Sequence, residues 1–187
     1  RRQRQMCIRD RRIFDEKREE LSKRFVPAFM RQIQGIESEL EVFHALRSVK
    51  QENTPKGEPL VTAMQQIGSG GILASLWELT EAANVGMQIE MSRISIRQEC
   101  VEVCEYYHLN PYQMTSAGTV LMVTRDGNAL VRCLEESGAR ASVLGVTTAD
   151  HAKVITSGDE VRYLDRPAPD ELMRWWEEQA QKEVRSE

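Results

Sequence analysis

Three glycines and a serine stand between a predicted strand and a predicted helix, at residues 68–71 (GSGG). Glycine lets backbone N–H groups approach a ligand closely, and the first turn of a helix adds unpaired N–H groups and a partial positive charge. Ser69 adds a hydroxyl donor. Gly68, Ser69, Gly70 and Gly71 are therefore candidates for binding a phosphate. Because the P-loop lysine and the GxGxxG spacing are both absent, a structural turn is an equally good interpretation.

Two carboxylates form a second candidate site. Glu78 and Glu81 lie three residues apart in the helix predicted after the glycine turn, so they share a helix face. Such a pair can serve as acid and base or can hold a cation. The alternative is a solvated helix face without chemistry.

The cysteines do not predict a metal site. Structural zinc sites use paired CxxC spacings, and the four cysteines lack them. Cys100 and Cys104 share a helix face, but no second cysteine pair lies nearby in the sequence to complete a zinc site. We therefore predict reduced thiols and no metal. The four are Cys7, Cys100, Cys104 and Cys133.

The elements that must position these residues alternate between short apolar strands and amphipathic helices. This order predicts an α/β (α+β) fold, with a mixed β-sheet layered with helices. The segment 119–124 is continuously apolar and favours a central strand covered on both faces. Gly86 is predicted to be the C-terminal cap of the helix predicted over 71–85. The predicted strands are 60–67, 87–94, 119–124, 141–146, 153–156 and 161–164, and the predicted helices are 71–85, 95–108, 126–137 and 167–183.

The chain has three expected parts. Residues 1–12 hold six arginines and a single acidic residue, and we interpret them as a disordered or non-native end. Residues 13–59 form a helical lead-in and linker, with Pro27 and Gly35 expected to bend or divide the helix. Residues 60–187 form the globular domain with a terminal helix. Within the lead-in, an apolar stripe is predicted at Leu21, Phe25, Phe29 and Ile33.

Composition narrows the location and the partners. The chain is 41% hydrophobic and 29% charged, and no apolar run approaches the roughly 18 residues that a membrane span needs. The net charge of -4 and the lack of aromatics among the terminal arginines argue against nucleic-acid binding. We expect a cytoplasmic protein that binds neither nucleic acid nor membrane.

From residue 60 to 167 the motifs follow a specific order. A turn ending in Gly70 and Gly71 leads into a helix with Ala74 and Glu78, followed by Val85, Gly86 and a strand. A corner at 109–111 (LNP), Gly118 before an apolar strand, the segment 141–146 (ASVLGV) and Leu164-Asp165 come later. This order resembles the C-terminal domain of the aminoimidazole ribonucleotide synthetase (AIR synthase-like) superfamily. Within that superfamily, the chain is most similar to the hydrogenase maturation carbamoyl dehydratase branch.

The resemblance implies a function and partners. The superfamily activates a carbonyl or acid oxygen with ATP and magnesium, which are held mainly by an N-terminal domain that dimerises. Because that domain is missing here, this fragment alone is expected to be inactive. The full-length protein is expected to be a homodimer that acts with a maturation partner protein. The resemblance also adds Ser116 and Gly118 to the candidate phosphate or substrate site, whereas no catalytic residue is assigned.

Three departures from the branch support a second hypothesis, that of a non-catalytic binding or regulatory module. Gln65 and Gln66 replace the His-Asp that precedes the glycine turn in the branch. Ser116 and Ala117 replace its Asn-Glu, and no cysteine follows Cys133 to form the terminal cysteine of the dehydratase. The fold would then be kept while the carboxylates are lost.

Overall fold

The computed structural model describes residues 13–34, 45–47, 49, 54–116 and 118–186. The predicted disordered or non-native end, residues 1–12, lies outside this part. The described lead-in contains helices α2 (Arg18–Arg24) and α3 (Pro27–Gln34). Pro27 is the first residue of α3, where its missing N–H costs no helical hydrogen bond. The bend or division predicted at Pro27 is confirmed as a division, whereas Gly35 lies outside the described residues.

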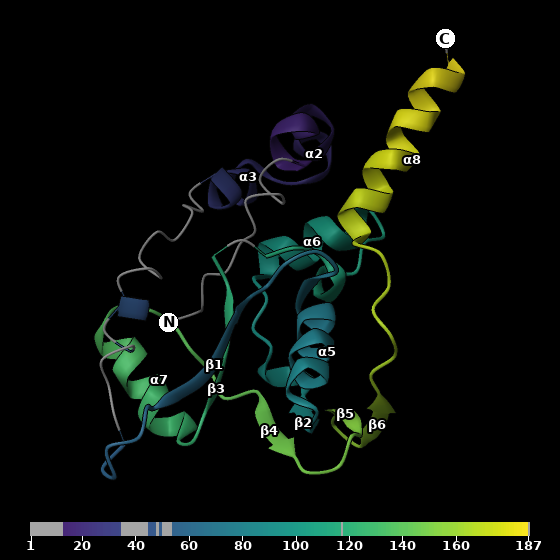
Figure 1. The fold of residues 1–187 in the computed structure, drawn as a ribbon. Helices are drawn as coiled ribbons and strands as arrows, with labels where there is room; N and C mark the ends of the chain where they lie inside the picture. The colour runs from purple at the N-terminus through teal and green to yellow at the C-terminus, as the bar shows by residue number, and fades with distance from the viewer. Residues whose placement is uncertain (1–12, 35–44, 48, 50–53, 117, 187) are drawn as a thin grey trace.

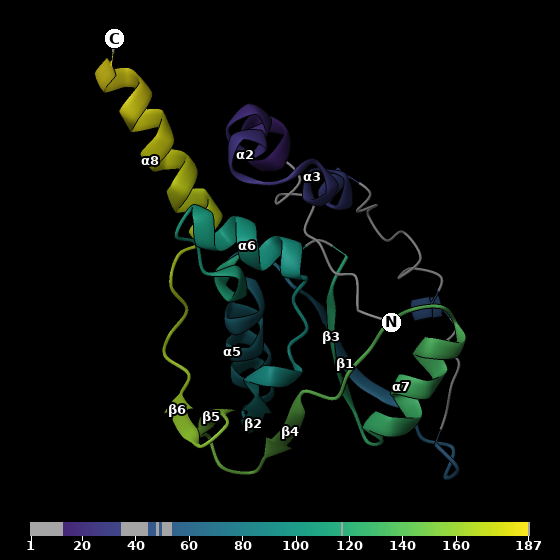
Figure 2. The same cartoon turned by 180° about the vertical axis from the view of Figure 1, so that it is seen from behind.

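The lead-in packs on the body through its predicted apolar stripe. Leu21 and Ile33 are buried in one core cluster, and Phe25 and Phe29 pack against it. The same cluster contains Trp175 from the last helix. Figures 1 and 2 show α2 and α3 beside the end of the molecule from which that helix departs. The segments at the two ends of the described chain therefore share one core.

The first sheet joins the strand before the glycine turn to the apolar strand at 120–124. Strand β1 (Val61–Gln66) pairs antiparallel with β3 (Val120–Thr124), and helix α5 (Gly71–Ala83) follows β1 directly. Helix α7 (Gly127–Glu136) follows β3, and Asp126 caps it as predicted by accepting a hydrogen bond from the Ala129 N–H at 2.9 Å. Within the described chain, β3 pairs with β1 alone. The prediction that β3 is a central strand is therefore wrong. Its apolar residues pack elsewhere: Met122 contacts the cluster that contains Leu130 of α7, and Leu121 belongs to the cluster that contains Met87 of the opposite sheet.

The second sheet is four-stranded and mixed, in the order β4-β2-β5-β6. Strands β2 and β5 are parallel, while the β2–β4 and β5–β6 pairs are antiparallel. The terminal hairpin is confirmed as β5 and β6. The strands are β2 (Gly86–Glu90), β4 (Gly145–Thr148), β5 (Lys153–Ser157) and β6 (Glu160–Tyr163).

The remaining helices cover this framework. Helix α6 (Gln98–Tyr106) lies near the start of α8 (Glu171–Ser186), and the outer part of α8 projects away from the body (Figure 1). The described chain also contains the short helices η1 (Met91–Arg93) and η2 (Pro111–Gln113). None of the described helices combines the length and the apolar character required to cross a membrane.

Several predicted boundaries are wrong for local reasons. Helix α5 ends at Asn84, which adopts the left-handed conformation, so Gly86 does not cap the helix and instead begins β2. The strand predicted over 87–94 ends at Glu90, whose carboxylate accepts from the Ser92 N–H and starts the turn η1. Helix α8 begins four residues later than predicted, after Asp170.

Candidate functional site

The glycine turn connects β1 to α5 in a conformation that favours glycine. Gly70 and Gly71 have φ values of +79° and +71°, in the left-handed region that L side chains rarely adopt. A Cβ atom on Gly71 would lie 2.4 Å from the Tyr112 carbonyl oxygen and 2.6 Å from the Met114 nitrogen. The path of the chain and its close packing on η2 therefore account for two of the three glycines.

Most N–H groups of the turn have partners inside the chain. Gly71 donates to the Gly68 carbonyl oxygen at 3.2 Å, and Gly68 donates weakly to the Ser75 hydroxyl at 3.4 Å. Gly70 donates to the carboxylate of Asp170 at 2.9 Å. Ser69 is exposed, and within the described chain its N–H and hydroxyl make no hydrogen bond. The tip of the turn is therefore open, while its inner face binds a carboxylate.

Asp170 joins the glycine turn to two other segments. Its Oδ2 atom also accepts from the Thr115 N–H at 2.9 Å and the Thr115 hydroxyl at 2.7 Å. Its Oδ1 atom accepts from the N–H groups of Leu172 and Met173, at 3.1 and 3.3 Å, and so caps α8. Burial acts to raise the pKa of Asp170, but hydrogen bonds from Thr115, Gly70 and Met173 outweigh it and lower that pKa. The carboxylate is therefore held as an anion.

The second predicted segment, Ser116 and Gly118, follows Thr115, which binds this carboxylate. The Ser116 and Thr119 hydroxyls are 2.8 Å apart and share a hydrogen bond. Thr115, the residue before Ser116, binds the same carboxylate oxygen as Gly70. The structure thus connects the two predicted segments through Asp170, a residue that sequence reasoning did not select.

Glu78 and Glu81 bind different partners. The Gln65 amide donates to Glu78 at 2.9 Å. Lys153, only 8% exposed, donates to Glu81 at 2.5 Å, and its ammonium lies 4.6 Å from the centre of the Trp77 ring. The two carboxylates thereby attach β1 and β5 to α5. In the described part of the chain, no group of three histidine, cysteine, aspartate or glutamate side chains gathers as metal ligands.

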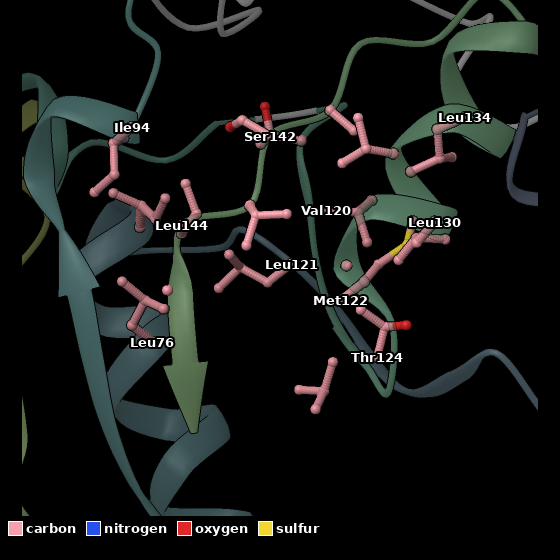
Figure 3. A pocket seen from close by; sticks show the side chains of 18 of the residues that line it. Leu76, Ile94, Val120, Leu121, Met122, Thr124, Leu130, Leu134, Ser142 and Leu144 are labelled. Atoms are coloured by element: carbon pink, nitrogen blue, oxygen red, sulfur yellow. The ribbon is translucent and has the colours of Figure 1, made fainter. Parts of the chain in front are cut away.

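A separate cavity of about 530 Å³ lies between the two sheets. Figure 3 shows Leu121 of β3, Leu130 of α7 and Leu144 before β4 around it. Its walls are mainly apolar, and among the predicted site residues only Gly118 lines it. The cavity therefore meets the candidate site at Gly118 but is not lined by the glycine turn itself.

Sequence reasoning missed Thr115 and Asp170. Asp170 precedes a helix, and aspartate is a preferred N-cap residue, so its contact with α8 has a sequence signal. Its second oxygen reaches Gly70, 100 residues away in the chain, and no local pattern reports such a contact.

Comparison with known proteins supports the fold and the family. The family model described as "AIR synthase related protein, C-terminal domain" matches residues 12–157, a range that includes the helical lead-in. A putative hydrogenase expression/formation protein of Methanocaldococcus jannaschii is 30% identical over 120 residues, 61% of this chain and 36% of that protein. Carbamoyl dehydratase HypE of Rhodobacter capsulatus is 26% identical over 123 residues, 62% of this chain and 36% of its own length. The chain thus spans little more than a third of the curated relatives it matches.

Three solved structures have a similar fold. E. coli HypE, a hydrogenase maturation protein, has a TM-score of 0.58 at 22% identity, covering 72% of this chain and 41% of that one. HypE in complex with ATP has a TM-score of 0.55 at 14% identity, covering 61% and 38%. The HypE–HypF complex has a TM-score of 0.53 at 20% identity, covering 59% of this chain and 38% of that one. The chain therefore belongs to the family of AIR synthase related protein C-terminal domains and is related to the HypE hydrogenase maturation proteins.

Proposed function

We propose that this chain is the C-terminal domain of an ATP-dependent protein of the hydrogenase maturation type. In this proposal the turn at 68–71 helps to hold a phosphate of the nucleotide or substrate, beside a domain that precedes it. The observation that carries the proposal is the hydrogen bond from Gly70 to Asp170, because it places a negatively charged oxygen against the turn.

The exposed tip supplies the remaining donors. Ser69 presents an N–H and a hydroxyl to solvent, and a Cβ atom on Gly68 would contact nothing within 4 Å. An oxyanion can therefore approach this edge without meeting a side chain from Gly68. Ser116 and Gly118 belong to the neighbouring segment and form the other side of the proposed site.

The relatives supply the class of ligand and partner. HypE has been solved with ATP and with HypF, and the curated relatives are almost three times as long as their matched part. By analogy, we propose that ATP with Mg²⁺ binds mainly to a preceding domain. The complete protein is proposed to be a cytoplasmic homodimer that acts with a maturation partner.

The test is an ATP titration of the complete natural protein by isothermal calorimetry in the presence of magnesium. Ser69→Glu places a negative charge at the open tip of the turn. Asn128→Glu adds the same charge at an exposed position of the first turn of α7, where a carboxylate is favourable. We expect Ser69→Glu to weaken ATP binding and Asn128→Glu to leave it unchanged. Equal affinities in both variants would remove the turn from the site.

A second candidate function is a non-catalytic binding module. It is favoured by Gln65 and Gln66 at the end of β1, where the hydrogenase maturation branch has His-Asp, and by the engagement of Gln65 with Glu78. ATP hydrolysis by the complete protein with magnesium separates the two candidates. Turnover would contradict a purely binding role, whereas ATP binding without turnover would support it.

A further inference from the structure

The carboxylate of Asp170 lies on the inner face of the glycine turn, where it accepts a hydrogen bond from the Gly70 N–H. Three donors converge on its Oδ2 atom: the N–H groups of Gly70 and Thr115 and the Thr115 hydroxyl. We call these three donors the carboxylate seat. Because Gly70 and Thr115 belong to different segments, the seat is built by the tertiary fold, and a helix cap alone would need neither of them.

The negative charge of the Asp170 carboxylate is stabilised by hydrogen-bond donors. Asp170 is 3% exposed, and no lysine, arginine or histidine among the described residues forms an ion pair with it. Charged acceptors strengthen such hydrogen bonds, so an oxyanion suits this set of donors. The oxyanion class includes both carboxylates and phosphates.

Asp170 immediately precedes helix α8, which is fixed to the body by contacts of its own. Leu172 and Trp175 are buried in the core cluster that contains Ile13 and Phe14, and the Trp176 indole donates to Glu16 at 3.2 Å. The outer part of α8 is largely exposed and projects from the body in both views (Figures 1 and 2). The first turn of α8 therefore holds Asp170 in the seat.

We propose that Asp170 is an internal competitor for the oxyanion site at the glycine turn, and that an external oxyanion binds Gly70 and Thr115 only when this carboxylate leaves. The inference rests on the proposed function and adds to it a means of regulation. With α8 docked, the inner face of the turn is closed and its tip at Ser69 is open. Movement of the first turn of α8 would open the seat.

The test vacates the seat without removing the helix cap. Asp170→Ser keeps an N-cap side chain for α8 but is too short to fill the carboxylate position. The complete 187-residue chain, labelled with ¹⁵N, is titrated with sodium acetate and separately with inorganic phosphate, at an ionic strength held constant with sodium chloride. The amide resonances of Gly70 and Thr115 report occupancy of the seat. The two titrations distinguish a carboxylate ligand from a phosphate ligand.

We expect saturable shifts at Gly70 and Thr115 in Asp170→Ser, with an affinity at least about tenfold above that of the wild type, as loss of a charge-assisted competitor requires. Asp126→Ala is the matched control, because Asp126 caps α7 at an exposed position and its carboxylate, among the residues that the structure describes, accepts from the Ala129 N–H alone. It should behave as the wild type does.

Two results would overturn the inference. One is a folded Asp170→Ser chain whose Gly70 and Thr115 resonances respond to neither anion. The other is a wild-type chain that binds either anion at the seat as tightly as the variant does. If Asp170→Ser does not fold, Asp170→Thr, which also supplies an N-cap hydroxyl and also leaves the carboxylate position empty, is tested in the same way. Neither result depends on ATP binding by the complete protein, so failure of this inference and failure of the proposed function can be told apart.

Discussion

Replacing Asp170 with alanine should destabilise the fold far more than removing an ordinary helix cap. Loss of an aspartate N-cap costs about 1 kcal/mol. Gly70 and Thr115 would also lose a charged acceptor in a buried site, and each such hydrogen bond contributes about 1.5–3 kcal/mol. Since water can replace part of the loss, we expect a decrease of about 3–5 kcal/mol in the free energy of unfolding.

The assay is urea unfolding followed by circular dichroism, with Asp126→Ala as the comparison. Asp126 accepts one N–H at an exposed helix start, so its replacement should cost only about 1 kcal/mol. Equal free energies of unfolding in the two variants would contradict this expectation. Such a result would mean that the long-range hydrogen bonds of Asp170 add nothing to its capping role.

Three further predictions use the same unfolding assay. Gly71→Ala should lower the free energy of unfolding by about 2–4 kcal/mol, because Gly71 has a positive φ and an added Cβ would overlap the backbone of η2. Gly68→Ala is the control and should change the free energy of unfolding little. Equal losses in the two variants would contradict this prediction. Lys153→Met should change it by less than about 1 kcal/mol, since the buried stem is kept and Glu81 is 56% exposed; a much larger loss would show that the ion pair is essential. The pKa of Asp170 is lowered, so the stability it contributes is complete above its unfolded-state value of 3.8 and is lost as the pH falls through the folded value. The stability difference between wild type and Asp170→Asn should therefore shrink at low pH, and a difference that grew on acidification would contradict the sign.

The elements with strong local signals were predicted well. Helix α5 and the cap of α7 at Asp126 were predicted from apolar spacing and capping residues, because these signals act within a few residues. The position of β3 in its sheet was predicted wrongly, since a continuously apolar strand can be covered by helices or by another sheet without gaining a second strand partner. The end of α5 was missed because Asn84 adopts the left-handed conformation more often assigned to glycine.

The candidate site was predictable only in its local part. The four residues of the glycine turn were identified from their types and position, but the role of Gly71 in packing on η2 depends on atoms 41–43 residues away. Asp170 and Thr115 could not be joined to Gly70 from sequence, because their contact exists only after the core around Leu172 and Trp175 has formed. Long-range hydrogen bonds of this kind leave no periodic pattern.

The central claim, that the glycine turn at 68–71 receives a phosphate oxygen, is tested most directly by NMR of the complete natural protein during titration with ATP and magnesium. The account predicts that the Ser69 and Gly70 amide resonances shift in proportion to ATP occupancy and that the Asp170 carboxyl resonance moves with them. ATP binding that leaves these three resonances unchanged would contradict it.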